Sequence, residues 1–145
     1  MSEKIEKVAV LGAGVMGAQL SGHLANAGIP SLLFDISQDL SEKGIETLTT
    51  LKPAPLFNPK NSELIEPCNY DEHIDRIGEA DWILEAVAER LDIKHKVYQS
   101  IVPQLKSSAI LTSNTSGIPL ADLATVLPDD VKPRFMITHF FNPPR

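Results

Sequence analysis

Short apolar runs alternate with longer segments of helical periodicity along the 145-residue chain. The apolar runs have the length of strands and predict strands at residues 7–11, 31–35, 64–68, 81–87, 108–112 and 135–140. The segments between them predict helices at residues 15–27, from 37 to just before Pro53, 71–77, 93–105 and 120–123. Strands that alternate with helices in this way are typical of an α/β protein with a doubly wound, mainly parallel sheet.

Three local patterns add detail to this picture. Apolar residues recur every four positions in the helix at 93–105, which predicts a buried stripe of Ile93, Val97, Ile101 and Leu105. Three prolines in residues 52–59 predict an extended surface connection, because proline has no N–H group and a fixed φ angle. Pro67 predicts that the strand at 64–68 lies at an outer position in the sheet.

The most informative motif is the glycine-rich turn between the first strand and the first helix. Gly12, Gly14 and Gly17 form a G-x-G-x-x-G pattern. Gly12 allows the tight turn, Gly14 lets a pyrophosphate approach the backbone, and Gly17 lets the helix pack closely on the strand. The helix that begins at Val15 and Met16 offers N–H groups and its positive dipole end to the phosphates. The alternative is a glycine-rich turn that binds nothing, and the flanking strand and helix count against it.

An acidic residue completes the cofactor motif. Asp35 ends the second apolar run, 18 residues after Gly17. A carboxylate at this place accepts hydrogen bonds from the adenosine ribose of a dinucleotide. No Arg or Lys occupies positions 36–38, where one would hold a 2′-phosphate. The sequence therefore predicts NAD as the cofactor rather than NADP.

Composition narrows the class of protein. A hydrophobic content of 43% and a charged content of 22% are ordinary for a globular chain, and the length fits one domain. The net charge of −6 disfavours nucleic acid or an anionic membrane as a partner. The apolar runs are too short to cross a bilayer, and the charged N-terminus does not resemble a signal peptide. Cys68 is the single cysteine, which fits a cytoplasmic location and a buried structural role.

Three predicted strands end in polar segments, at residues 85–89, 113–116 and 139–142. Because the carboxyl ends of parallel strands meet at one edge of a sheet, these segments are expected beside the glycine-rich turn. His139 ends the last of these strands, and histidine is the side chain best suited to take a proton from an alcohol near neutral pH. From its position alone, a structural histidine is an equally good interpretation.

The motifs together resemble the NAD-binding domain of the 3-hydroxyacyl-CoA dehydrogenase family. The matching stretches appear in the family's order and span most of the chain: Gly12-Ala13-Gly14-Val15-Met16-Gly17, Glu85-Ala86-Val87-Ala88-Glu89, Ser113-Asn114-Thr115-Ser116 and His139-Phe140-Phe141-Asn142-Pro143. The first is shared with many dehydrogenases, whereas the last two together are highly specific. The resemblance implies a Rossmann-type fold, an acyl-CoA substrate, and NAD-dependent oxidation of L-3-hydroxyacyl-CoA to 3-ketoacyl-CoA in fatty-acid β-oxidation.

The resemblance also assigns roles to individual residues. His139 matches the family's general base, Ser116 the serine that contacts the substrate oxygen and the nicotinamide side, and Asn142 an asparagine of the cofactor and substrate pocket. Glu89 and Lys94 match positions that touch NAD. The cofactor-binding set is therefore expected to be Gly12, Gly14, Val15, Met16, Gly17, Asp35, Glu89, Lys94, Ser116 and Asn142, and no metal site is predicted.

Three nearby polar residues can each be interpreted either as part of the site or as local structural residues. Glu85 matches the family in type, but at the end of a strand it could equally anchor the loop that follows. Ser113 and Asn114 could be turn or capping residues, because their side chains satisfy local N–H groups in many loops.

The chain departs from the family pattern in length. The family pairs its histidine with a glutamate about a dozen residues downstream, whereas this sequence ends at Arg145. Residues 1–145 are therefore expected to be an NAD-binding domain truncated at its C-terminal end, without the helical domain for dimerisation and substrate binding. Residues 52–56 look more like long bacterial members in which a crotonase-like domain follows. The longer parent is expected to be a homo-oligomer.

Two other functions stay open from the sequence. One is a β-hydroxyacid dehydrogenase acting on a small acid, a class that shares the glycine-rich turn but not the motifs at 113–116 and 139–143. The other is a non-enzymatic NAD-binding relative.

Overall fold

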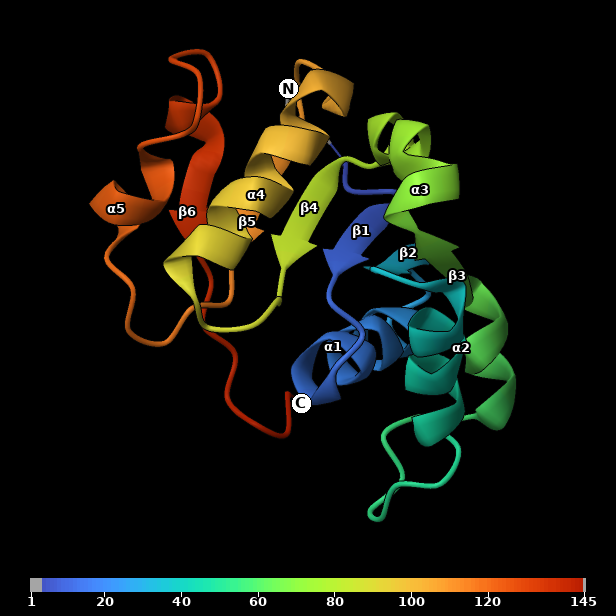
Figure 1. Ribbon diagram of the computed structural model, residues 1–145. Helices are drawn as coiled ribbons and strands as arrows, with labels where there is room; N and C mark the ends of the chain where they lie inside the picture. Colours follow the sequence, from blue (N-terminus) through green and yellow to red (C-terminus); the bar gives the residue numbers. More distant parts are fainter. Residues whose placement is uncertain (1–3, 145) are drawn as a thin grey trace.

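A parallel sheet forms the centre of the molecule in the computed structural model, which describes residues 4–144 (Figure 1). Its strands are β1 (Val8–Leu11), β2 (Ser31–Asp35), β3 (Ile65–Asn69), β4 (Trp82–Glu85), β5 (Ile110–Ser113) and β6 (Phe135–Ile137). All neighbouring pairs are parallel, in the order β3-β2-β1-β4-β5-β6. This confirms the doubly wound Rossmann-type sheet and the outer position of the strand that contains Pro67.

Helices connect successive strands on the two faces of the sheet. The α-helices are α1 (Val15–Asn26), α2 (Gln38–Thr47), α3 (Tyr70–His73), α4 (Leu91–Ile101) and α5 (Leu120–Ala124). Short 3₁₀ helices are η1 (Pro59–Leu64), η2 (Ile74–Glu79), η3 (Val102–Gln104) and η4 (Lys132–Arg134). Figure 1 shows the order β1-β4-β5-β6 running from the centre of the sheet to one side, with α4 crossing in front of it.

The alternation of side chains along each strand divides the core in two. Val8 and Val10 of β1 pack with apolar residues of α1, whereas Ala9 and Leu11 pack with residues of α4 and α5 on the other face. Each face buries a separate cluster of aliphatic and aromatic side chains. Strands β1 to β4 contribute to both clusters, whereas β5 and β6 contribute only to the one on the α4 side, so the sheet is buried on both sides over β1 and β4.

Several element boundaries differ from the sequence prediction. The final strand ends at Ile137 rather than residue 140, and the strand predicted at 108–112 lies at 110–113. The helix predicted at 71–77 is one α-helical turn followed by η2. The helix predicted at 93–105 changes to 3₁₀ geometry at Val102, because Pro103 has no N–H group to continue it.

The predicted buried stripe of α4 is also partly wrong. Its fully buried residues are Lys94, Tyr98 and Ile101, whereas Ile93 and Val97 are only partly buried. The helix is rotated so that a lysine and a tyrosine face the sheet, because both find polar partners at the end of β4.

Candidate active site

The glycine-rich turn has the geometry that its three glycines predict. Gly12 has a φ angle of 102°, and an added Cβ there would lie 2.5 Å from the Ala86 carbonyl oxygen. An added Cβ at Gly17 would collide with the Gly12 carbonyl, so this position brings the helix against the strand. At Gly14, by contrast, an added Cβ would meet nothing within 4 Å. The backbone at Gly14 is therefore open to a ligand.

The first turn of α1 faces this open space. Gly14 is its N-cap and contributes no side-chain hydrogen bond, and the turn contains no acidic residue. The N–H groups of Val15, Met16 and Gly17 lie at the positive end of the helix dipole. These groups fit a pyrophosphate without any movement of a capping side chain.

Asp35 connects the turn to the second strand. Its Oδ2 accepts a hydrogen bond from the Ala13 amide at 2.8 Å, and its Oδ1 accepts one from the Ile36 amide at 2.7 Å. Each carboxylate oxygen keeps a further lone pair, so Asp35 can also accept hydrogen bonds from ribose hydroxyls. The residue both fixes the turn and presents a negative charge at its side.

A cleft of about 370 Å³ opens between these groups and the start of α4. One wall is polar, with Asp35 beside the glycine-rich turn, and the opposite wall is apolar. The lining residues are Gly12, Gly14, Asp35, Ile36, Tyr70, Ala86, Val87, Ala88, Ile93 and Val97. An apolar slot beside a carboxylate suits an adenine ring with its ribose.

A buried ion pair lies behind the cleft. Glu85 and Lys94 are 0% and 1% exposed, and Lys94 Nζ lies 2.6 Å from Glu85 Oε2. Glu85 Oε1 accepts hydrogen bonds from the Tyr98 hydroxyl at 2.5 Å and the Ser113 hydroxyl at 2.7 Å. The amide of Val87 donates to Oε2 at 3.0 Å. These contacts fit the interpretation of Glu85 as an anchor for the loop after β4, because its carboxylate joins β4, β5 and α4.

The buried pair continues to Glu89 and Ser116. Lys94 Nζ lies 3.5 Å from Glu89 Oε1, and the Ser116 amide and hydroxyl both donate to Glu89 Oε2 at 2.7 Å. The Thr115 hydroxyl donates to Glu89 Oε1 at 2.6 Å. Desolvation raises the pKa of Glu89, but the hydrogen bonds from Thr115 and Ser116 and the charge of Lys94 together lower it to about 2. Glu89 is therefore ionised near neutral pH and holds Ser116 in place.

His139 and Asn142 lie on the segment that follows β6. Both residues are exposed, and the His139 ring packs edge to face against the Phe141 ring, 5.2 Å between centroids. Gln19 of α1 lies 3.5 Å from Asn142 Oδ1, so the segment returns to the start of α1. The segments at 85–89, 113–116 and 139–142 thus follow parallel strand ends at one edge of the sheet, as the strand pattern predicts.

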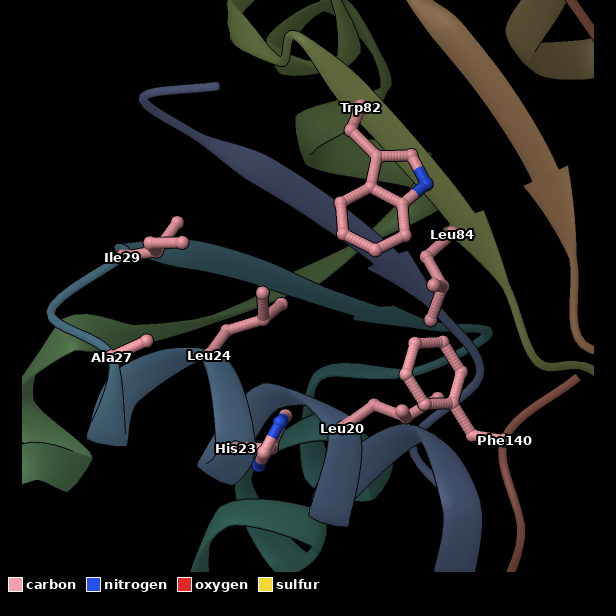
Figure 2. Close-up of a pocket in the computed structure, with 8 residues that line it drawn as sticks. All are labelled: Leu20, His23, Leu24, Ala27, Ile29, Trp82, Leu84 and Phe140. Atoms are coloured by element: carbon pink, nitrogen blue, oxygen red, sulfur yellow. The ribbon is translucent and has the colours of Figure 1, made fainter. Parts of the chain in front are cut away.

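A second cavity lies on the α1 face of the sheet and has a different character. Its volume is about 260 Å³, and its lining is almost entirely apolar. Figure 2 shows the Phe140 ring reaching from the C-terminal segment toward Leu84 and Leu20, with Trp82 beyond them. None of the predicted cofactor residues lines this cavity.

Sequence reasoning found some parts of this site and missed others. It singled out the glycine-rich turn, Asp35, Glu89 and Ser116, which lie around one edge of the sheet, and their roles stay predictions. The hydrogen bonds between Glu89 and Ser116 come from the structure. It missed Tyr98, whose hydroxyl holds Glu85, and the cleft-lining role of Ile93 and Val97. Lys94, expected to touch NAD, has its amine buried against Glu85, so contact with a cofactor stays a prediction.

Comparisons with known proteins agree with the geometry. Residues 7–145 match the family described as 3-hydroxyacyl-CoA dehydrogenase, NAD binding domain. The chain is 40% identical over 166 residues to a probable 3-hydroxyacyl-CoA dehydrogenase of Bacillus subtilis, covering 100% of this chain and 21% of that protein. It is 41% identical over 152 residues to a putative fatty acid oxidation complex trifunctional enzyme of Rickettsia felis, with the same coverage of 100% and 21%.

A solved structure gives the same result for the fold. The (S)-3-hydroxybutyryl-CoA dehydrogenase PaaH1 of Ralstonia eutropha superposes with a TM-score of 0.84 and 28% identity, covering 97% of this chain and 51% of that one. The chain therefore spans about half of this structure and about a fifth of the two sequence relatives. Within residues 4–144, no helix is long and apolar enough to cross a bilayer.

Proposed function

The chain belongs to the 3-hydroxyacyl-CoA dehydrogenase family as an NAD-binding domain, and we propose that it is the cofactor-binding part of a longer enzyme of fatty-acid β-oxidation. The proposed reaction is the oxidation of L-3-hydroxyacyl-CoA to 3-ketoacyl-CoA. The observation that carries the proposal is the meeting of the open glycine-rich turn, the Glu89–Ser116 pair and the His139 segment at one edge of the sheet.

The proposed mechanism divides binding and proton transfer between separate groups. The amides at the start of α1 bind the pyrophosphate, and Asp35 accepts hydrogen bonds from the adenosine ribose. When bound, NAD⁺ supplies a hydride acceptor at its nicotinamide ring. C3 of the substrate would give its hydrogen with the electron pair to that ring, while a His139 ring nitrogen would take the hydroxyl proton and the C3–O bond would become a carbonyl.

Ser116 and Asn142 orient the reacting oxygen in this proposal. The Ser116 amide and hydroxyl both donate to Glu89, which fixes the place of this side chain. In the complex its hydroxyl would donate instead to the substrate oxygen, because the single proton of the substrate hydroxyl is taken by His139. Asn142 lies three residues beyond His139 and offers an amide group on the same segment. Lys94 acts through Glu89, since its amine lies 3.5 Å from that carboxylate.

The finer parts of the proposal concern the rest of the protein. The family's partner glutamate and helical domain would follow this chain, and the longer protein would be a homo-oligomer that binds acyl-CoA. A cytoplasmic location rests on the unpaired Cys68. We expect the 145-residue chain alone to bind NADH but to turn over acetoacetyl-CoA poorly, because loss of a residue that orients a catalytic histidine can cost about 10⁴-fold in rate.

Calorimetric titration of the 145-residue chain with NADH tests the core of the proposal. Gly14→Val places a side chain in the open space of the turn at a φ angle of −72°, which any L-residue adopts. We expect this variant to lose NADH binding and keep its melting temperature. Unchanged NADH affinity in Gly14→Val would refute the proposed cofactor position, and full acetoacetyl-CoA turnover by the chain alone would refute the need for a second domain.

A further inference from the structure

The hydrogen-bond ladder between β5 and β6 is extended by a side chain. The last backbone bond of the pair runs from the Thr138 amide to the Ser113 carbonyl, at 3.0 Å. The next amide along this segment that is bonded to the β5 side is that of Phe140, and it donates to Asn114 Oδ1 at 2.8 Å. A carboxamide oxygen thus takes the place that a strand carbonyl would occupy.

Asn114 is itself fixed to the centre of the sheet. Its backbone amide donates to the Glu85 carbonyl at 2.8 Å, directly at the end of β4. The neighbouring Ser113 hydroxyl donates to the buried Glu85 carboxylate. The Asn114 side chain therefore extends from the hydrogen-bonded network around Glu85 to the loop after β6.

His139 lies between the two fixed amides. Thr138 on one side is bonded to Ser113, and Phe140 on the other is bonded to Asn114. Within the described part of the chain, the imidazole itself makes no hydrogen bond; its ring contacts Phe141. The position of the imidazole is therefore set by its backbone and by rotation about its side-chain bonds.

We propose that Asn114 is a positioning residue for the reaction: its carboxamide holds the peptide that carries His139 in the place from which the imidazole takes the substrate proton. This inference rests on the proposed function, since it assigns a purpose to a fixed His139. Asn114 does not touch the reacting atoms. It acts through the Phe140 amide, and the alternative is that Asn114 only completes a turn.

The two interpretations predict different properties for three variants. Asn114→Ala removes the acceptor of the Phe140 amide, whereas Asn114→Asp keeps an acceptor and adds a negative charge near His139. Asn58→Ala is the matched control, because Asn58 Oδ1 also accepts from a backbone amide, that of Lys60 at 3.0 Å, in the cap of η1.

The first measurement uses the 145-residue chain and needs no activity. Amide hydrogen exchange, followed by NMR, should show faster exchange of the Phe140 amide in Asn114→Ala and near-normal exchange in Asn114→Asp and Asn58→Ala. Unchanged protection of Phe140 in Asn114→Ala would overturn the proposal, because the carboxamide would not be holding the peptide.

The second measurement uses the longer protein. We expect Asn114→Ala to lower kcat about 10²-fold with NADH affinity within twofold of the parent, since a displacement of about 1 Å can cost that much. Asn114→Asp should recover most of kcat and move the acid limb of the kcat–pH profile to higher pH, because a nearby carboxylate favours the protonated imidazole.

The outcomes separate the failure of this inference from the failure of the proposed function. A parent protein without 3-hydroxyacyl-CoA turnover would overturn the proposed function and with it the purpose assigned to Asn114. An active parent whose Asn114→Ala variant keeps its kcat, although its Phe140 amide exchanges faster, would overturn the inference alone.

Discussion

Replacing Lys94 by methionine tests how the site is supported from behind. The side chain has a similar length, but the variant leaves the Glu85 carboxylate in the core without its cation. Breaking a buried ion pair by removing one partner typically costs about 3–5 kcal/mol. Glu85 keeps hydrogen bonds from Tyr98, Ser113 and the Val87 amide, so we expect the lower end of this range, about 3 kcal/mol.

Replacing Glu85 by leucine should cost more. The Tyr98 and Ser113 hydroxyls and the Val87 amide all lose their acceptor, and each buried unpaired donor costs about 1–3 kcal/mol. Lys94 keeps the Val87 carbonyl at 3.3 Å and Glu89 at 3.5 Å, so its charge is still partly compensated. The larger loss in Glu85→Leu therefore comes from the donors rather than from the lysine.

Urea unfolding at pH 7 measures both losses. With a slope of about 1–3 kcal/mol per molar urea, a loss of about 3 kcal/mol lowers the midpoint by roughly 1–3 M. Lys132→Met is the control, because Lys132 pairs with Asp129 at the surface at 3.4 Å and should lose less than about 1 kcal/mol. If Lys94→Met loses no more than this control, or if Glu85→Leu is the more stable of the two variants, the reasoning about the buried pair is wrong.

Three further predictions concern cofactor choice, the chemical step and acid stability. Asp35→Ala should weaken NADH binding and reduce the preference for NADH over NADPH, because the carboxylate accepts hydrogen bonds from ribose hydroxyls and repels a 2′-phosphate. Equal affinities of the unmodified chain for the two cofactors in titration would refute this. His139→Gln in the longer protein should lower kcat about 10²–10⁴-fold with little change in NADH affinity, and a stable variant with parental kcat would exclude the general-base role. The pKa of Glu89 is about 2 in the folded chain, against an ordinary value of about 4.5. Ionised Glu89 therefore contributes stability that is present above about pH 4.5 and is lost as the pH falls toward 2. Glu89→Gln should flatten the dependence of the unfolding free energy on pH in that interval, and an unchanged dependence would contradict the low pKa of Glu89.

The glycine-rich turn was predictable because its chemistry is local. The three glycines, the strand before them and the helix after them lie within a single stretch of sequence. Gly12 and Gly17 are required by close contacts within the fold, whereas Gly14 leaves space for a ligand. Asp35 follows from the same unit, since a parallel neighbour of the first strand must end beside the turn. The parallel pairing of the strands and the edge at which their carboxyl ends meet also follow from the alternation of strands and helices, whereas the order of the strands comes from the structure.

The end of β6 was less predictable because its limit is set by a partner far away in the sequence. Residues 135–140 read as one apolar run, but the ladder with β5 ends at Ile137. Beyond it, the chain is held by the Asn114 side chain, 26 residues earlier, rather than by a strand. A pattern of apolar residues cannot distinguish these two ways of satisfying a backbone amide.

The orientation of α4 illustrates what a fuller use of the sequence would have given. Ile83 and Glu85 are two residues apart in β4, so they face the same side of the sheet, and Ile83 lies in the cluster that packs against α4. A carboxylate on that buried side needs donors from the helix that covers it. Lys94 and Tyr98 are long polar residues four positions apart, so they lie on one stripe of that helix. The alternation of side chains between the two faces of the sheet along β4 and the four-residue spacing in α4 together favour a buried stripe through Lys94 and Tyr98. They disfavour the purely apolar stripe. A helix in this orientation also directs Ile93 and Val97 toward the cleft, which both residues line in the structure.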